Sequence, residues 1–82
     1  MLQVELVSPE KKVWSGEAVS VSARTFDGDL GILTGHTPLL GVLVDGKVTI
    51  NGADGSASEF NVSGGFLSVS NNRVSILAEA TN

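Results

Sequence analysis

The sequence predicts an all-β protein, folded as a sandwich or flattened barrel of eight to ten short strands. Apolar residues alternate with polar residues through most of the chain, which is the period of a half-buried strand. Glycine, asparagine and aspartate recur at short intervals between these segments, where tight turns need them. No segment keeps a helical period, and residues 76–82, ILAEATN, are the one candidate for the start of a helix.

The N-terminal part of the chain predicts two strands joined by a turn. Residues 8–12, SPEKK, separate the strands, because Pro9 lacks the amide hydrogen that a strand ladder requires. Trp14 follows in the second strand, and we assign it to the core rather than to an interface. The inward positions of the two strands are expected to be Leu2, Val4, Leu6, Val19, Val21 and Ala23.

The C-terminal part predicts further strands with turns between them. Asp45-Gly46 and Asn71-Asn72 tolerate the left-handed backbone that two-residue hairpins demand, and residues 51–55, NGADG, predict a longer tip. The pair Gly64-Gly65 opens an apolar strand, which indicates a bulge or a close backbone approach. The inward positions are expected to be Val48, Ile50, Phe60, Val62, Leu67, Val69, Val74 and Ile76.

Composition excludes several classes of function. The 82 residues predict one domain, spanning residues 1–82, with net charge −4 and no basic cluster for nucleic acid. No apolar run approaches the ~20 residues of a membrane span, and the N-terminus does not resemble a signal peptide. Without cysteine, and with one histidine, the chain lacks a zinc ligand set, so we expect no metal and no cofactor.

The segment from Gly28 to Leu40, GDLGILTGHTPLL, combines three glycines and a proline with the single histidine of the chain, His36. Nucleophilic catalysis needs a base beside a nucleophile and a third group to orient it, and no such set is visible. We therefore favour a turn that supports binding over a hydrolase centred on His36. A free-standing β-sandwich module for peptide or carbohydrate is the other alternative.

Two long segments resemble the epsilon subunit of rotary F-type ATP synthases, the counterpart of the mitochondrial delta subunit. They are residues 27–40, DGDLGILTGHTPLL, and residues 64–80, GGFLSVSNNRVSILAEA; residues 4–18, VELVSPEKKVWSGEA, fit as well. The resemblance covers essentially the whole chain and implies an N-terminal β-sandwich of about ten strands in two five-stranded sheets. Thr34 replaces a proline often found in the family. Typical members continue into a two-helix hairpin, so we expect either a naturally short subunit or an excised domain.

The resemblance also implies a function. A non-catalytic subunit of this kind lies in the central stalk, peripheral to the cytoplasmic face of the bacterial plasma membrane, and couples proton-driven rotation to ATP synthesis. Its implied partners are the gamma subunit and the c-ring, with no nucleotide bound in the absence of the hairpin. Asp29 and Leu30 fall at the position of the c-ring contact. The residues that fall on the gamma-facing side are Ser8, His36, Thr37, Leu39 and Gly41.

Overall fold

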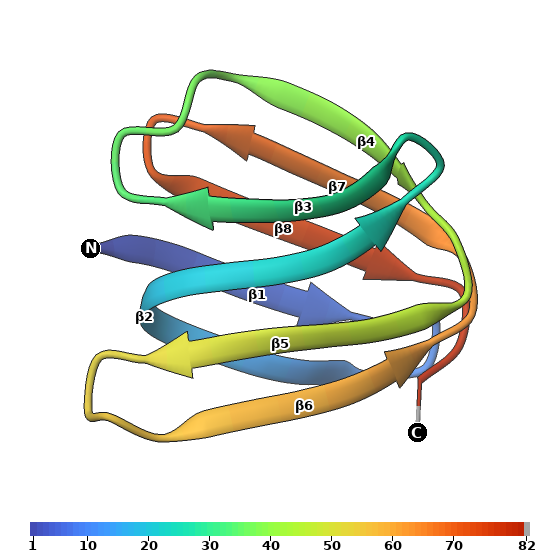
Figure 1. Cartoon of the computed structure of the whole chain (residues 1–82). Helices are drawn as coiled ribbons and strands as arrows, with labels where there is room; N and C mark the ends of the chain where they lie inside the picture. The colour runs from blue at the N-terminus through green and yellow to red at the C-terminus, as the bar shows by residue number, and fades with distance from the viewer. Residues whose placement is uncertain (82) are drawn as a thin grey trace.

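The computed structural model describes residues 1–81, and within them it contains eight β-strands and no helix (Figure 1). The all-β class is confirmed, with eight strands rather than the ten implied by the resemblance. The expected helix start at residues 76–82 is wrong for the described residues, since the chain there ends a strand and then pairs Thr81 with Val62. The strands are β1 (Leu2–Val7), β2 (Lys12–Thr25), β3 (Gly28–Leu33), β4 (Leu39–Leu43), β5 (Gly46–Gly52), β6 (Ala57–Val62), β7 (Gly65–Ser70) and β8 (Arg73–Ala78).

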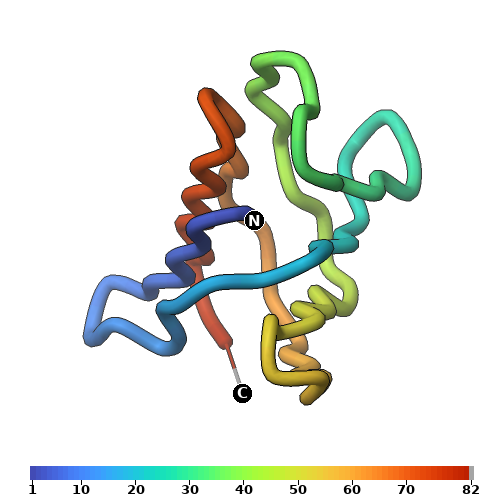
Figure 2. Tube along the Cα trace, turned by 90° about the vertical axis from the view of Figure 1, so that its left-hand side faces the viewer, coloured from blue at the N-terminus to red at the C-terminus, as the bar shows by residue number. Residues whose placement is uncertain are grey.

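The long strand β2 explains the smaller number of strands. Its 14 residues pair with β1 in their first part and with β3 and β5 in their second part. One layer therefore has the order β2–β1–β8–β7–β4, and the other has the order β3–β2–β5–β6. Figure 2 shows these layers side by side, with β2 passing from one to the other. A single strand thus serves both layers of the sandwich.

A β-bulge marks the place where β2 changes layer. Ala18 pairs with Gly52 and Ser20 pairs with Asn51, which leaves Val19 as the extra residue. As a result Ala18 and Val21 both face the core, and Val19 is 44% exposed. The prediction of Val19 as an inward residue is wrong, because the bulge shifts the alternation by one position.

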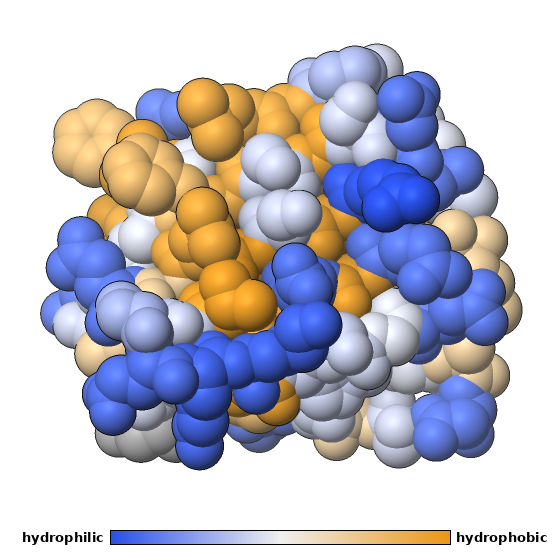
Figure 3. Space-filling view, turned by 180° about the vertical axis from the view of Figure 1, so that it is seen from behind, coloured by the Kyte–Doolittle hydropathy of each residue, from blue (hydrophilic) through white to orange (hydrophobic). Residues whose placement is uncertain are grey.

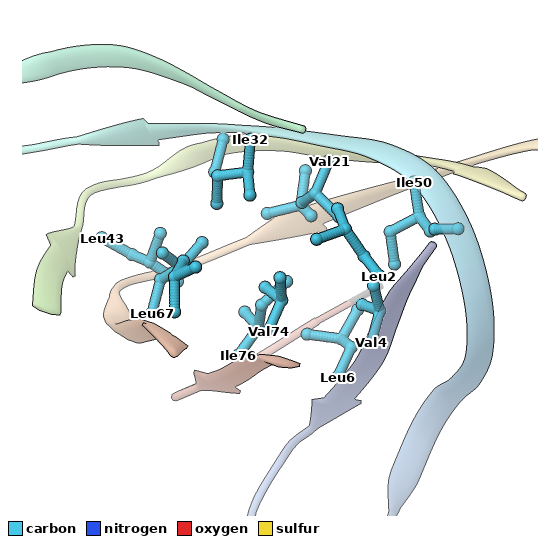
Figure 4. Packing of buried hydrophobic residues seen from close by; sticks show 14 of the residues in the cluster. Leu2, Val4, Leu6, Val21, Ile32, Leu43, Ile50, Leu67, Val74 and Ile76 are labelled. Carbon is cyan, nitrogen blue, oxygen red and sulfur yellow. The ribbon is translucent and has the colours of Figure 1, made fainter. Parts of the chain in front are cut away.

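The hydrophobic core lies between the two layers (Figure 4). Leu2, Leu6 and Ile76 are completely buried there, as the alternation predicts. Trp14 is half-buried and packs against this core, which bears out its assignment in part. Among the described residues, every buried side-chain nitrogen or oxygen has a hydrogen-bond partner.

Of the two hairpin turns predicted from the sequence, one is present and the other is not. Asn71 and Asn72 have φ angles of 51° and 62° and form the two-residue turn between β7 and β8, as predicted. Asp45-Gly46 does not close a hairpin, because β4 pairs with β7 while β5 pairs with β2 and β6. The chain crosses from one layer to the other at this point, which a local turn signal does not reveal.

The sequence predicts that another part of the backbone lies close to the pair Gly64-Gly65, and the structure shows this at Gly65. This residue has a φ of +128°, and a Cβ atom there would overlap the carbonyl oxygen of Leu77 in the neighbouring strand. Only glycine therefore fits at the start of β7.

Candidate docking surfaces

The outer face of the layer that contains β1, β8, β7 and β4 carries a row of apolar side chains. Val42 lies opposite Phe66, Phe66 lies opposite Leu77, and Leu77 lies opposite Val7. Because side chains alternate between the two faces of a strand, all of these point away from the core. We call the set of Leu40, Val42, Phe66, Leu77 and Val7 the apolar band. Figure 3 shows hydrophobic residues gathered on this face and bordered by hydrophilic ones.

Ser8 lies at one end of the apolar band. Its backbone N–H donates to the carbonyl oxygen of Lys11 at 2.9 Å, which closes the turn after β1. A shallow hollow of about 270 Å³ opens beside it, lined by Pro9, Phe66 and Leu77 among others. Gly65 and Ala78, which are paired across β7 and β8, also line this hollow.

His36 lies in the loop that leads into the other end of the apolar band. Its backbone N–H donates to the carbonyl oxygen of Leu33 at 3.1 Å, and its ring Nδ1 lies 2.7 Å from the carbonyl oxygen of Thr37. Since a carbonyl only accepts, Nδ1 carries the proton in this arrangement. Within residues 1–81 no serine hydroxyl is hydrogen-bonded to this ring.

The residues predicted for the gamma-facing side all lie near the apolar band, but only some of them are exposed. Ser8 and His36 lie at its two ends, and Thr37 is exposed beside His36. Leu39 and Gly41 face inward, and Leu39 packs against the core. The outward side chains of β4 belong instead to Leu40 and Val42.

Sequence reasoning missed the outward members of the band at Val42, Phe66 and Leu77. A signal was present, because apolar residues stand next to each other within these strands. Adjacent apolar residues in a strand cover both of its faces, so such a strand is apolar outside as well as inside. The pairs are Leu39-Leu40, Val42-Leu43, Phe66-Leu67 and Ile76-Leu77.

The second candidate surface is the hairpin of β2 and β3, which was predicted to carry a c-ring contact at Asp29 and Leu30. Asp29 is exposed, and its Oδ1 accepts a hydrogen bond from Arg24 Nε at 3.0 Å in a cross-strand ion pair. Leu30 is half-buried and packs against the core. The tip of the hairpin is formed by Phe26 and Asp27, and Phe26 is 80% exposed.

Within the described residues, one side chain has a clearly shifted pKa, and no cluster of metal ligands is found. Hydrogen bonds from the hydroxyl and the backbone N–H of Ser56 lower the pKa of Asp54 below its ordinary value of 3.8. No group of three histidine, cysteine, aspartate or glutamate side chains within residues 1–81 is placed to hold a metal ion. The same residues form no helix that would be long and apolar enough to cross a membrane.

Comparison with known proteins places the chain in one family. Residues 1–82 match the family described as ATP synthase, Delta/Epsilon chain, beta-sandwich domain. The ATP synthase epsilon chain of Frankia casuarinae is 56% identical over 81 residues, which cover 95% of this chain and 92% of that one. The ATP synthase epsilon chain of Streptomyces avermitilis is 54% identical over 78 residues. The match covers 95% of this chain but 63% of the length of the Streptomyces protein.

The fold has a close counterpart among solved structures. A chain in the structure of the Euglena gracilis mitochondrial ATP synthase superposes with a TM-score of 0.91 and 23% identity. The superposition covers 99% of this chain and 52% of that one. At this identity the likeness supports the two-layered fold.

Proposed function

The chain belongs to the delta/epsilon chain family of ATP synthase, and on that premise we propose that it is a non-catalytic subunit of the central stalk. Residues 1–82 would form its N-terminal β-sandwich domain, peripheral to the cytoplasmic face of the bacterial plasma membrane. Its task would be to join the gamma subunit to the c-ring, so that proton-driven rotation of the ring reaches the catalytic head.

The apolar band is the observation that carries this proposal. Leu40, Val42, Phe66 and Leu77 are all exposed, although they are large and apolar. An exposed cluster of apolar side chains on a hydrogen-bonded sheet is typical of a surface that is buried against another protein. We assign it to the gamma subunit, with Ser8 and His36 at its ends and with Leu39 and Gly41 supporting it from below.

The β2–β3 hairpin provides a second surface, which we assign to the c-ring. It belongs to the layer opposite the apolar band, and its tip is hydrogen-bonded to that band through Phe26 N–H and Val42 O at 2.8 Å. Since β2 runs through both layers, a force on the hairpin reaches the other layer through one continuous strand. This architecture suits a rigid connector between two rotating parts.

The proposal is tested by binding to a purified catalytic head that carries gamma but lacks this subunit. Calorimetry should detect binding of the chain, and Leu77→Ser should weaken it by about tenfold or more, since central apolar contacts dominate interfaces. Leu33→Ser is the matched control, because Leu33 is 64% exposed on the outer face of the other layer.

Two results would contradict the proposal. The first is absence of binding by the unmodified chain to a head that is competent to bind a known epsilon chain. The second is equal loss of affinity in Leu33→Ser and Leu77→Ser, since the effect would then not belong to the apolar band.

A further inference from the structure

We infer that Glu79 and Arg73, at opposite borders of the apolar band, fix the orientation in which the gamma subunit binds this surface. Gamma would present an arginine or lysine to Glu79 and an aspartate or glutamate to Arg73, with apolar side chains between them. This inference rests on the proposed stalk function and names the chemistry of its contact with gamma.

Strand β8 carries the two charges on its outer face, on either side of Leu77. The outward positions of the strand are Arg73, Ser75 and Leu77, which alternate with buried residues. Glu79 is exposed and continues this line, because its backbone N–H donates to the carbonyl oxygen of Gly64 at 3.2 Å and extends the pairing with β7. The six residues that separate the charges place them about 20 Å apart along an extended strand.

Neither charge has an ionic partner in the part of the chain that the structure describes. Within residues 1–81 no ion pair or side-chain hydrogen bond joins Arg73 or Glu79 to another residue. The charge on the adjacent strand β1, Glu5, is already paired with Lys12 at 3.1 Å. Arg73 and Glu79 are therefore the charges that the middle of this face leaves for a partner.

The carboxylate of Glu79 lies at the rim of the hollow beside Ser8. Its Cδ lies 3.5 Å from the position that a Cβ atom would take at Gly64, so the side chain folds back across this glycine. Apart from Ser8 and Glu79, the hollow is lined by apolar side chains and glycine. A partner that covers the hollow removes water from the carboxylate, and an unpaired charge buried in this way opposes binding strongly. The partner therefore has to bring a cation to this position.

Arg73 lies at the other border of the apolar band, between polar neighbours. Gln3 of β1 lies on one side of it and Ser70 of β7 on the other. A charge at a polar rim contributes more to the association rate and to orientation than to affinity. A partner that bound in the reverse direction would bring its cation to Arg73 and its acid to Glu79, and both contacts would be repulsive. The two opposite charges therefore select one orientation.

The experiment measures the kinetics of binding to a purified catalytic head that carries gamma but lacks this subunit, by biolayer interferometry. Glu79→Gln keeps the shape of the side chain and removes its charge, so it should weaken binding about tenfold, mainly through faster dissociation. Glu79→Lys should weaken binding about a hundredfold, because two cations then face each other. Arg73→Gln should slow association several-fold at low salt and have little effect at about 0.5 M salt, where rim charges are screened.

The matched controls carry the same changes on the outer face of the other layer. Glu59→Gln and Arg24→Gln each remove one partner of an exposed ion pair, so each should change the affinity by less than about threefold. The urea midpoint of Glu79→Gln should equal that of the unmodified chain, because its backbone hydrogen bond to Gly64 remains. A lower midpoint would assign Glu79 to the stability of the fold and would overturn the inference.

The other outcomes separate this inference from the proposed function. If the unmodified chain does not bind a head that binds a known epsilon chain, the proposed function fails. If it binds, and Leu77→Ser weakens binding while Glu79→Gln and Arg73→Gln match the controls, only the inference fails. Tighter binding of Glu79→Gln, or equal affinities of Glu79→Gln and Glu79→Lys, would also overturn the inference, since either result means that no cation faces Glu79.

Discussion

The side-chain oxygen of Asn72 accepts a hydrogen bond from the backbone N–H of Gly35 at 2.7 Å, and so joins the β7–β8 turn to the loop that carries His36. The backbone carbonyl of Asn72 also accepts from the N–H of Gln3 at 2.8 Å. Three segments that are distant in sequence are therefore held together at one residue. The position of His36 at the end of the apolar band depends on this connection.

We expect Asn72→Gly to loosen the His36 loop without unfolding the protein. Glycine accepts the positive φ of 62° at this position, so the turn is kept while the acceptor for Gly35 N–H is lost. Stability should fall by about 1 kcal/mol. Amide hydrogen exchange should accelerate at Gly35, and affinity for gamma should decrease several-fold. Asn71→Gly is the matched control, and comparable exchange at Gly35 in the two variants would contradict the role of Asn72.

Gly65→Ala should be severely destabilising. The new Cβ would overlap the carbonyl oxygen of Leu77 and lie 2.9 Å from the Cα of Ala78, on a backbone with a φ of +128°. Overlap and backbone strain together should cost about 3 kcal/mol or more. Gly31→Ala provides the comparison, because a Cβ at Gly31 meets nothing within 4 Å. Urea unfolding should show a large loss for the first variant and little change for the second.

Much of the fold could be predicted because strand alternation is a local property. Residues such as Leu6 and Ile76 were placed in the core correctly from their polar neighbours alone. Val19 was misplaced because a bulge depends on the partner strand rather than on the sequence around it. The hairpin predicted at Asp45-Gly46 is wrong for a similar reason, since a turn signal does not say whether the two strands beside it pair.

The candidate site was harder to predict, because its side chains come from four strands. Register brings Val42, Phe66 and Leu77 into one row, and register between distant segments is not visible in a sequence. Leu30 stood beside Asp29 in the motif, and only the geometry separates an inward leucine from an outward aspartate. Motif resemblance therefore predicts the segments, and the structure shows which of their side chains are exposed.

The β5–β6 loop should give a pH-dependent contribution to stability through Asp54. Hydrogen bonds from Ser56 lower the pKa of Asp54 in the folded state below 3.8. A carboxylate with a lowered pKa stabilises the fold above its unfolded pKa, and this contribution disappears as the pH falls through the folded value. The urea midpoints of the unmodified chain and Asp54→Asn should differ at pH 6 and converge toward about pH 2. A difference that is independent of pH would contradict this assignment.

Truncation of the adjacent residues Ile76 and Leu77 should affect different properties, stability in the first case and binding in the second. Ile76 is fully buried and lies between Leu6 and Leu67 in the neighbouring strands, so Ile76→Ala should cost about 2–5 kcal/mol. Leu77 is 55% exposed on the outer face, so Leu77→Ala should cost less than about 1 kcal/mol while weakening binding to gamma.

Fluorescence of Trp14 can report both unfolding reactions, because it is the single tryptophan and packs against the core. A stability loss in Leu77→Ala as large as that in Ile76→Ala would mean that the apolar band is needed by the isolated domain. In that case its exposure would not be evidence for a docking surface. A stable Leu77→Ala that binds gamma weakly would instead separate the two faces of β8, the inner one serving the fold and the outer one serving assembly.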